Sequence, residues 1–213
     1  MRVVADAGPL ISLSNTCMLW ILEKLPFQFL LPPWVINEVS LFPKQTKHYK
    51  LSALRISDYI RSGILQEGEL GERGEEIARK VQHIANNVYF IKHRPLKIIQ
   101  RGEAEAIALA TLTDHAMLVD ERTIRLLLED PLELRNVLQI RTGARVSIDR
   151  ERAEELQEIV GDVLMLRSAD IVAYAYEERI LGKGKEFLEA ALYALKYAGC
   201  AISEQEIRDY LYG

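Results

Sequence analysis

Four acidic residues stand where an α/β sheet could gather them at one site. Asp6 and Asp120 each follow a short apolar run, a pattern typical of a buried parallel strand. Glu38 and Glu103 stand in the first turns of predicted helices. Because ligands of open α/β sheets bind beyond the carboxyl ends of the strands, we expect the four carboxylates to lie at one edge of the sheet.

Such a carboxylate set predicts a particular chemistry. The negative charges repel one another unless a cation neutralises them. Oxygen ligands alone favour a hard ion, Mg²⁺ or Mn²⁺, and one or two such ions can activate water for in-line displacement at phosphorus. A lone Asp6 would more often cap a helix or close a turn, so the prediction of phosphodiester hydrolysis depends on the whole set.

Two members of the set have a neighbouring alternative. Glu105 lies two residues after Glu103 in the same predicted helix, and Glu121 directly follows Asp120. Residues two apart on a helix point in different directions, so we expect no more than one of Glu103 and Glu105 to face a common site. Both alternatives stay open at this stage.

The order of the predicted elements is that of a parallel α/β fold. The strand before Asp6 is followed by a helix over residues 10–25, and a second strand and helix come next, an alternation typical of a parallel sheet. We expect a domain over residues 1–150, interrupted by a helical insertion at about 42–100, and a C-terminal helical extension over 151–213.

Composition limits the ways in which the chain could bind nucleic acid. The 213 residues are 49% hydrophobic and carry a net charge of −4, which allows a sizeable core but gives no overall positive field. Binding must therefore use local basic patches or cations that bridge to phosphate. The basic residues that could guide a backbone are Lys44, Lys47, Lys50, Lys92, Arg94, Lys97 and Arg101. Tyrosines of the tail could stack on bases, pack helices or form a dimer contact; they are Tyr174, Tyr176, Tyr193, Tyr197, Tyr210 and Tyr212.

Other kinds of site lack their residues. No glycine-rich phosphate loop is present, and Ser12 and Ser14 have no histidine placed for a catalytic triad. Cys17 and Cys200 stand far apart in apolar surroundings, which predicts two buried thiols. With neither a signal-peptide layout nor a membrane-spanning run, we expect a cytoplasmic protein with no membrane partner. The four histidines lack the paired spacing of a zinc site; they are His48, His83, His93 and His115.

The segments around the four acids together resemble a PIN domain. They are VVADAGPLI at residues 3–11, LPPWVINEV at 31–39, GEAEAIALA at 102–110 and LVDER at 118–122. The resemblance covers about residues 1–150 and is greatest to prokaryotic, notably archaeal, PIN-like proteins related to VapC toxin ribonucleases. It implies an α/β/α sandwich with a central parallel sheet and Mg²⁺- or Mn²⁺-dependent cleavage of single-stranded RNA.

The resemblance also implies roles for individual residues and partners. Asp6, Glu38, Glu103 and Asp120 match the four acids of the family, with Glu105 and Glu121 as alternatives. Ser12 matches a small hydroxyl residue that supports the site, and Arg101 and Arg122 are candidates for contact with RNA. A homodimer and an antitoxin-like protein partner are further expectations.

Two functions of other classes compete with the metal-dependent endoribonuclease. The first is a catalytically weak PIN-like module that binds RNA or a protein partner. The second is an α/β domain for a small ligand, which would need a pocket lined by more than acids. Clustering of the four carboxyl groups in the folded chain separates the nuclease from both alternatives.

Overall fold

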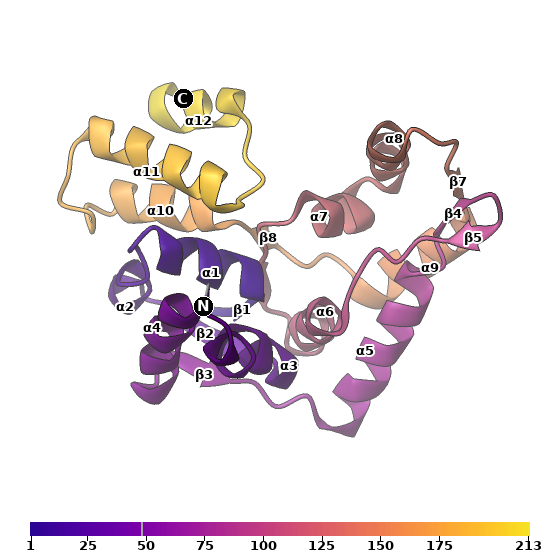
Figure 1. Cartoon of the computed structure of the whole chain (residues 1–213), viewed down its shortest axis with the longest axis horizontal. Helices are drawn as coiled ribbons and strands as arrows, with labels where there is room; N and C mark the ends of the chain where they lie inside the picture. The colour runs from indigo at the N-terminus through magenta and orange to yellow at the C-terminus, as the bar shows by residue number, and fades with distance from the viewer. Residues whose placement is uncertain (48) are drawn as a thin grey trace.

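The computed structural model describes residues 1–47 and 49–213, so His48 lies outside the described residues. Its centre is a sheet of parallel strands, which confirms the predicted fold class (Figure 1). Every neighbouring pair in this sheet is parallel. In spatial order the strands are β3 (Leu65–Glu67), β2 (Gln28–Leu31), β1 (Arg2–Ala5), β6 (Ala116–Leu118) and β8 (Met165–Leu166).

Both faces of this sheet are covered, and strand β1 shows why its residues are all apolar. Val3 and Ala5 belong to one hydrophobic core and Val4 to the other, because successive side chains of a strand point to opposite faces. The first core is built with α1 (Ala7–Asn15), α2 (Ile21–Lys24), α4 (Lys50–Arg61), α10 (Ser168–Glu177) and α11 (Lys185–Ala198). The second is built with α5 (Gly71–Ala85), α6 (Arg101–Thr113), α7 (Arg122–Glu129), α8 (Pro131–Thr142) and α9 (Arg150–Val160).

The two segments predicted as helical additions each supply a strand to the central sheet. Strand β3 comes from the insertion at about 42–100, and β8 comes from the extension over 151–213. These strands have only two or three residues, too short for a hydrophobic periodicity to reveal them. The additions are therefore part of the sheet as well as of its helical cover.

The predicted helix over residues 10–25 is divided into α1 and α2. Cys17 lies between them with a φ of 58°, a left-handed conformation that cannot continue an α-helix. Cys17 is also exposed, so the prediction of a buried thiol was wrong for this residue and right for the buried Cys200.

A second, antiparallel sheet lies at the right-hand end of Figure 1. It consists of β5 (Arg94–Pro95), β4 (Tyr89–Ile91) and β7 (Ser147–Ile148), in that order. Phe90 is opposite Pro95 on one side and Ser147 on the other. This sheet joins the end of the insertion to the segment that follows α8.

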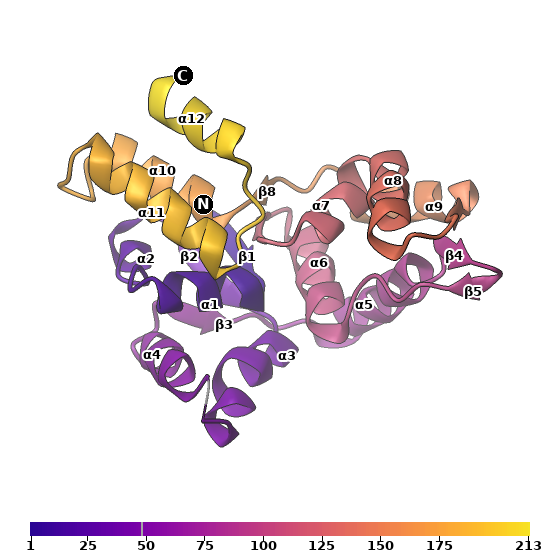
Figure 2. The ribbon, with the colours of Figure 1, turned by 45° about the horizontal axis from the view of Figure 1, so that its top comes forward.

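The C-terminal helices pack beside α1 (Figure 2). Helices α10 and α11 contact α1, and α12 (Glu204–Tyr212) contacts α11. The Arg167 side chain joins these elements, because it donates to the carbonyl of Ala201 at 3.2 Å and pairs with Glu206 at 2.6 Å. In the described part of the chain, none of the helices has the length and apolar character that crossing a bilayer would need.

Candidate active site

Asp6 comes directly after β1, at the carboxyl edge of the sheet. Its N–H donates to the carbonyl of Leu118 in β6 at 3.0 Å, which extends the parallel pairing by one residue. Its side chain is 7% exposed and caps α1, because Oδ2 accepts from the Gly8 N–H at 3.4 Å. The capping role expected of a lone aspartate is therefore present, alongside a position at the ligand-binding edge.

Asp120 follows the adjacent strand β6 and is held by the C-terminal part of the chain. Its Oδ1 accepts from the Ser168 N–H and its Oδ2 from the Ser168 hydroxyl, both at 2.8 Å. Its main-chain carbonyl accepts from the Ala201 N–H at 3.0 Å. The side chain is 2% exposed, so these bonds satisfy a carboxylate that has little contact with water.

Glu38 reaches the site from a short stretch of π-helix. Helix α3 (Pro33–Ile36) continues as a π-helical turn over Asn37–Leu41, which contains Glu38. Its carboxylate lies against Gly102 at the start of α6: a Cβ there would stand 2.7 Å from Glu38 Oε2. Single π-helical turns occur frequently at functional sites, and the absent side chain of Gly102 is what lets Glu38 approach α6.

Glu103 and Glu121 face each other across the site. Glu103 Oε2 accepts from the Gln100 N–H at 2.5 Å in a capping box that begins α6. Glu121, the exposed residue that precedes α7, lines the same pocket, and its nearness is one of the causes that raise the pKa of Glu103.

Glu105 has a different environment from Glu103. Its Oε2 accepts from the Trp34 N–H at 2.9 Å, and its Oε1 pairs with Arg101 Nε at 2.8 Å. The side chain is 5% exposed and holds α3 to α6. The structure thus places Glu103 in the lining of the pocket that the other acids share, whereas Glu105 lies outside this lining, near enough to Glu38 for its charge to raise the pKa of Glu38.

The acids described above, with the exception of Glu105, line one pocket of about 510 Å³, which we call the acid pocket. Gly8 and Arg122 also line it, as do Gly199 and Ala201 from the C-terminal segment. The tail therefore forms part of its wall, so the acid pocket is not made by residues 1–150 alone. Its carboxylates come from Asp6, Glu38, Glu103, Asp120 and Glu121.

Burial, together with the charges of neighbouring acids, makes Asp6, Glu38 and Glu103 harder to ionise. Burial raises the pKa of Asp6 to about 6, with further increases from Glu121 and Asp120, although the N–H groups of Ala7 and Gly8 oppose the shift. Burial and the charge of Asp6 raise the pKa of Glu38. Burial, Asp6 and Glu121 raise the pKa of Glu103 to about 8, against the opposing hydrogen bond from Gln100. Such mutual repulsion is the electrostatic condition that favours a bound cation.

The donor set fits a hard divalent cation in its chemistry, because it consists of carboxylates at one pocket. Across residues 1–47 and 49–213, however, no three side chains of His, Cys, Asp or Glu are already arranged to hold a metal ion. Asp6 and Asp120 are fixed by their hydrogen bonds. Rotation of the longer Glu38, Glu103 or Glu121 side chains is therefore the movement that would bring several oxygens onto one ion.

The other predicted residues take different places. Ser12 is buried and its hydroxyl donates to the Ala198 carbonyl at 3.4 Å, which ties α1 to α11 outside the lining of the acid pocket. Arg122 lines the acid pocket and donates to Glu133 at 3.4 Å. Arg101 lies over the Trp34 ring, with its Cζ 4.3 Å from the ring centroid. Arg101 thus lines an adjoining pocket instead.

Sequence reasoning did not find Ser168, Ala201 or Gly102. A serine at the start of a tail helix carries no signal that it will bond Asp120, 48 residues earlier. Gly102 was recognisable as the residue before Glu103 in a helix start, where glycine is a poor helix former. Its purpose, however, depends on where Glu38 lies.

Comparison with known proteins identifies one related family. The family model that matches residues 2–130 describes a PIN domain. The match runs from β1 to the residue after α7 and includes all five acids of the pocket, while Ser168 and Ala201 lie beyond it. No curated protein and no solved structure gave a match.

Proposed function

The chain belongs to the PIN-domain family, and we propose that it is a divalent-cation-dependent endoribonuclease that hydrolyses phosphodiester bonds of single-stranded RNA. PIN domains are usually nucleases and generally use divalent metal ions. The observation that carries the proposal is the acid pocket, where five carboxylates converge within the stretch matched by the family. A pocket for a neutral small ligand would not need this repulsion among its lining groups.

The carboxylates divide into fixed and movable groups. A bound Mg²⁺ or Mn²⁺ would supply Lewis-acid activation of water and stabilisation of charge at phosphorus. Asp6 and Asp120, pinned by hydrogen bonds, would fix the position of such an ion at the sheet edge. Glu103, whose pKa burial and the neighbouring acids raise, would give up its proton as its oxygens turn to the ion.

A pocket that adjoins the acid pocket supports the proposal that the substrate is single-stranded. A space of about 630 Å³ is lined by Trp34 and Arg101, and it shares Gln100, Glu103 and Glu121 with the acid pocket. An indole with a guanidinium over its face suits an unpaired base, which every single strand offers and a duplex hides.

The alternative function, a catalytically weak PIN-like module that binds RNA or protein, is favoured by two observations. Both oxygens of Asp120 already accept hydrogen bonds from Ser168, and no three acids of the described chain are in coordinating positions. In this alternative the two adjoining pockets would bind a strand through Arg101 in one and Arg122 in the other, without cutting it.

Cleavage assays separate the two functions. Purified wild-type protein, Asp6→Asn and the exposed control Asp162→Asn are given end-labelled single-stranded RNA with Mn²⁺ or Mg²⁺, and with EDTA. We expect wild type and the control to produce internal fragments, and Asp6→Asn or EDTA to abolish them. Single-stranded DNA and duplex RNA of the same sequence test the substrate class. Equal binding of RNA by wild type and Asp6→Asn without any cleavage would support the binding module instead.

The homodimer, the antitoxin-like partner and the relationship to VapC toxins stay predictions. Exposed apolar side chains near α4 offer a surface on which a second copy could pack; they include Leu41, Phe42, Leu51 and Leu54. Size-exclusion chromatography with light scattering on wild type and Leu51→Ser would measure the oligomeric state.

A further inference from the structure

The chain concentrates positive charge in two segments that are distant in sequence. Residues 77–102 hold six lysines and arginines with no aspartate or glutamate, although the whole chain has 31 acidic residues. Residues 134–148 hold three arginines and again no acid. The two segments meet in the small antiparallel sheet, where Phe90 of β4 pairs with Ser147 of β7. Folding therefore creates a basic end on a protein whose net charge is −4.

Several of these cations are left unneutralised. Arg79, Lys80 and Arg101 pair with glutamates, and such surface pairs cancel much of the local field. Within the described part of the chain, no carboxylate lies within ion-pair distance of Lys92, Lys97, Arg141 or Arg145, all of which are exposed. We call these four residues, together with Phe90, the hairpin surface.

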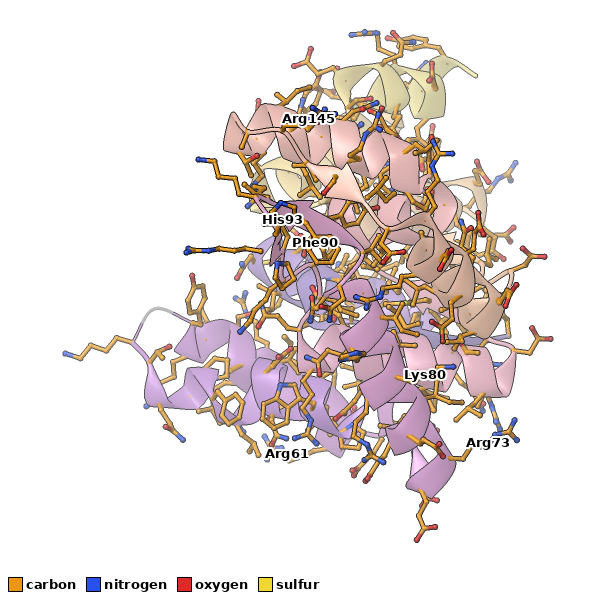
Figure 3. The ribbon with its side chains drawn as sticks, turned by 90° about the vertical axis from the view of Figure 1, so that its right-hand side faces the viewer. Arg61, Arg73, Lys80, Phe90, His93 and Arg145 are labelled. Atoms are coloured by element: carbon orange, nitrogen blue, oxygen red, sulfur yellow. The ribbon has the colours of Figure 1, made fainter. Side chains whose placement is uncertain are left out.

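Phe90 adds an aromatic group to this charge. It is half-buried, yet it is not among the residues of either hydrophobic core and has no ring contact with another described aromatic side chain. The exposed Arg145 stands two residues before Ser147, the partner of Phe90. Figure 3 shows Phe90, His93 and Arg145 on the end of the molecule that faces the viewer.

The hairpin surface adjoins the acid pocket. Lys97 and Arg141 line the space of about 630 Å³ that also contains Trp34 and Arg101. The same space is lined by Glu103 and Glu121, which belong to the acid pocket as well. A nucleic-acid strand that runs from the acid pocket through this space to the hairpin surface would meet no acidic lining residue other than Glu103 and Glu121.

We propose that the hairpin surface binds the phosphate backbone and an unpaired base of a single-stranded nucleic acid, several nucleotides away from the phosphodiester in the acid pocket. The inference rests on the proposed nuclease function and adds a second contact region to it. Lysine and arginine attract phosphates of any sequence, and an aromatic face stacks on any unpaired base. Arg141 and Arg145 lie beyond residues 2–130, so this region includes residues outside the part shared with the family.

Binding measurements with oligonucleotides of two lengths test this inference. Fluorescence anisotropy compares Lys92→Gln/Arg145→Gln with a matched control, Arg73→Gln/Lys183→Gln, which removes two exposed and unpaired cations elsewhere. Both pairs are made in the Asp6→Asn background with Mn²⁺, so that the RNA stays intact. The probes are labelled single strands of about 4 and about 12 nucleotides and a duplex of the longer sequence.

The expected losses are specific to the long single strand. The hairpin pair should weaken binding of the long probe about tenfold and reduce the slope of log Kd against log salt by about 1.4, the effect of two lost contacts on a single strand. The short probe and the control pair should change less than about twofold. Phe90→Ala should weaken binding of the long single strand about fivefold and leave the duplex unchanged.

Failure of this inference is distinguishable from failure of the proposed function. Equal binding of the long probe by the hairpin pair and the control pair would overturn the inference, while cleavage by wild type would still stand. A specific loss of binding with no cleavage by wild type would support the surface and overturn the nuclease. Competition by polyglutamate of equal charge, as strong as that of the long RNA, would indicate an acidic protein partner and overturn the inference. Circular dichroism melts check that every variant is folded.

Discussion

Ser168 donates two hydrogen bonds to Asp120, one from its main-chain N–H and one from its hydroxyl, both at 2.8 Å. The acceptor lies within residues 2–130, the family-matched region, and the donor begins α10 in the tail. The tail thus fixes the orientation of a carboxylate in the acid pocket, besides covering the sheet.

Replacing Ser168 with alanine should destabilise the fold and reduce cleavage. The hydroxyl bond to a buried carboxyl oxygen is lost, which costs about 2 kcal/mol of unfolding free energy. Asp120 would also gain freedom to rotate, so we expect a roughly tenfold lower kcat, the equivalent of about 1.4 kcal/mol in the activation barrier. Urea unfolding and RNA cleavage measure the two effects. Ser62→Ala, which removes an exposed hydroxyl, should change neither, and an equal loss in both variants would contradict the assignment.

Gly102→Ala should reduce activity without unfolding the protein. The new Cβ would stand 2.7 Å from Glu38 Oε2 and displace that side chain, while alanine is a better helix former than glycine by about 1 kcal/mol. We expect cleavage to fall at least about tenfold with an unchanged or higher melting temperature. Gly184→Ala is the matched control, because a Cβ there meets open space. Full activity of Gly102→Ala would show that the position of Glu38 does not matter.

Changing Glu103 to glutamine should abolish cleavage, whereas changing Glu105 to glutamine should mainly reduce stability. Glu103→Gln removes a repelled carboxylate from the acid pocket, so cleavage should be lost and stability without cation should be kept. Glu105→Gln weakens the contacts with Arg101 and Trp34, so we expect a loss of about 1 to 2 kcal/mol in stability and cleavage within about threefold of wild type. Cleavage assays and urea unfolding measure the two effects. Loss of cleavage in Glu105→Gln together with loss of stability in Glu103→Gln would exchange the roles of the two residues.

Stabilisation by a divalent cation should increase with pH. Burial and neighbouring acids raise the folded-state pKa of Asp6 from 3.8 to about 6 and that of Glu103 from 4.5 to about 8. Since these values exceed those of the unfolded chain, the cation-free fold loses stability as pH rises from about 4 through about 8. Bound Mn²⁺ offsets that loss, so its shift of the melting temperature should be larger at about pH 8.5 than at about pH 5.5.

The control for this pH dependence is the doubly neutralised protein. Asp6→Asn/Glu103→Gln removes the two carboxylates whose pKa values are raised to about 6 and about 8, and Mn²⁺ should then shift the melting temperature of this variant little at either pH. Differential scanning fluorimetry measures the melting temperatures of wild type and the double variant at both pH values, each with and without Mn²⁺. An equal Mn²⁺ shift in wild type at both pH values would indicate a cation site that does not involve these acids.

The sequence by itself determined the kinds of element and their order. Apolar runs that end at Asp6 and Asp120 predicted buried parallel strands, and a residue after a parallel strand must lie at the carboxyl edge of the sheet. The sequence likewise predicted a helical extension over residues 151–213, where α10, α11 and α12 lie. These properties depend on residues close together in the chain, and for that reason local patterns were sufficient.

Only the tertiary structure decided which side chains share a pocket. The rotation of α6 set Glu103 beside Glu121 and turned Glu105 toward Trp34. Packing of the tail brought Ser168 to Asp120, and pairing of β4 with β7 joined two basic segments into one surface. Each of these contacts joins parts of the chain that are distant in sequence, so its energy appears only when whole layers pack, and no local pattern of residues records it.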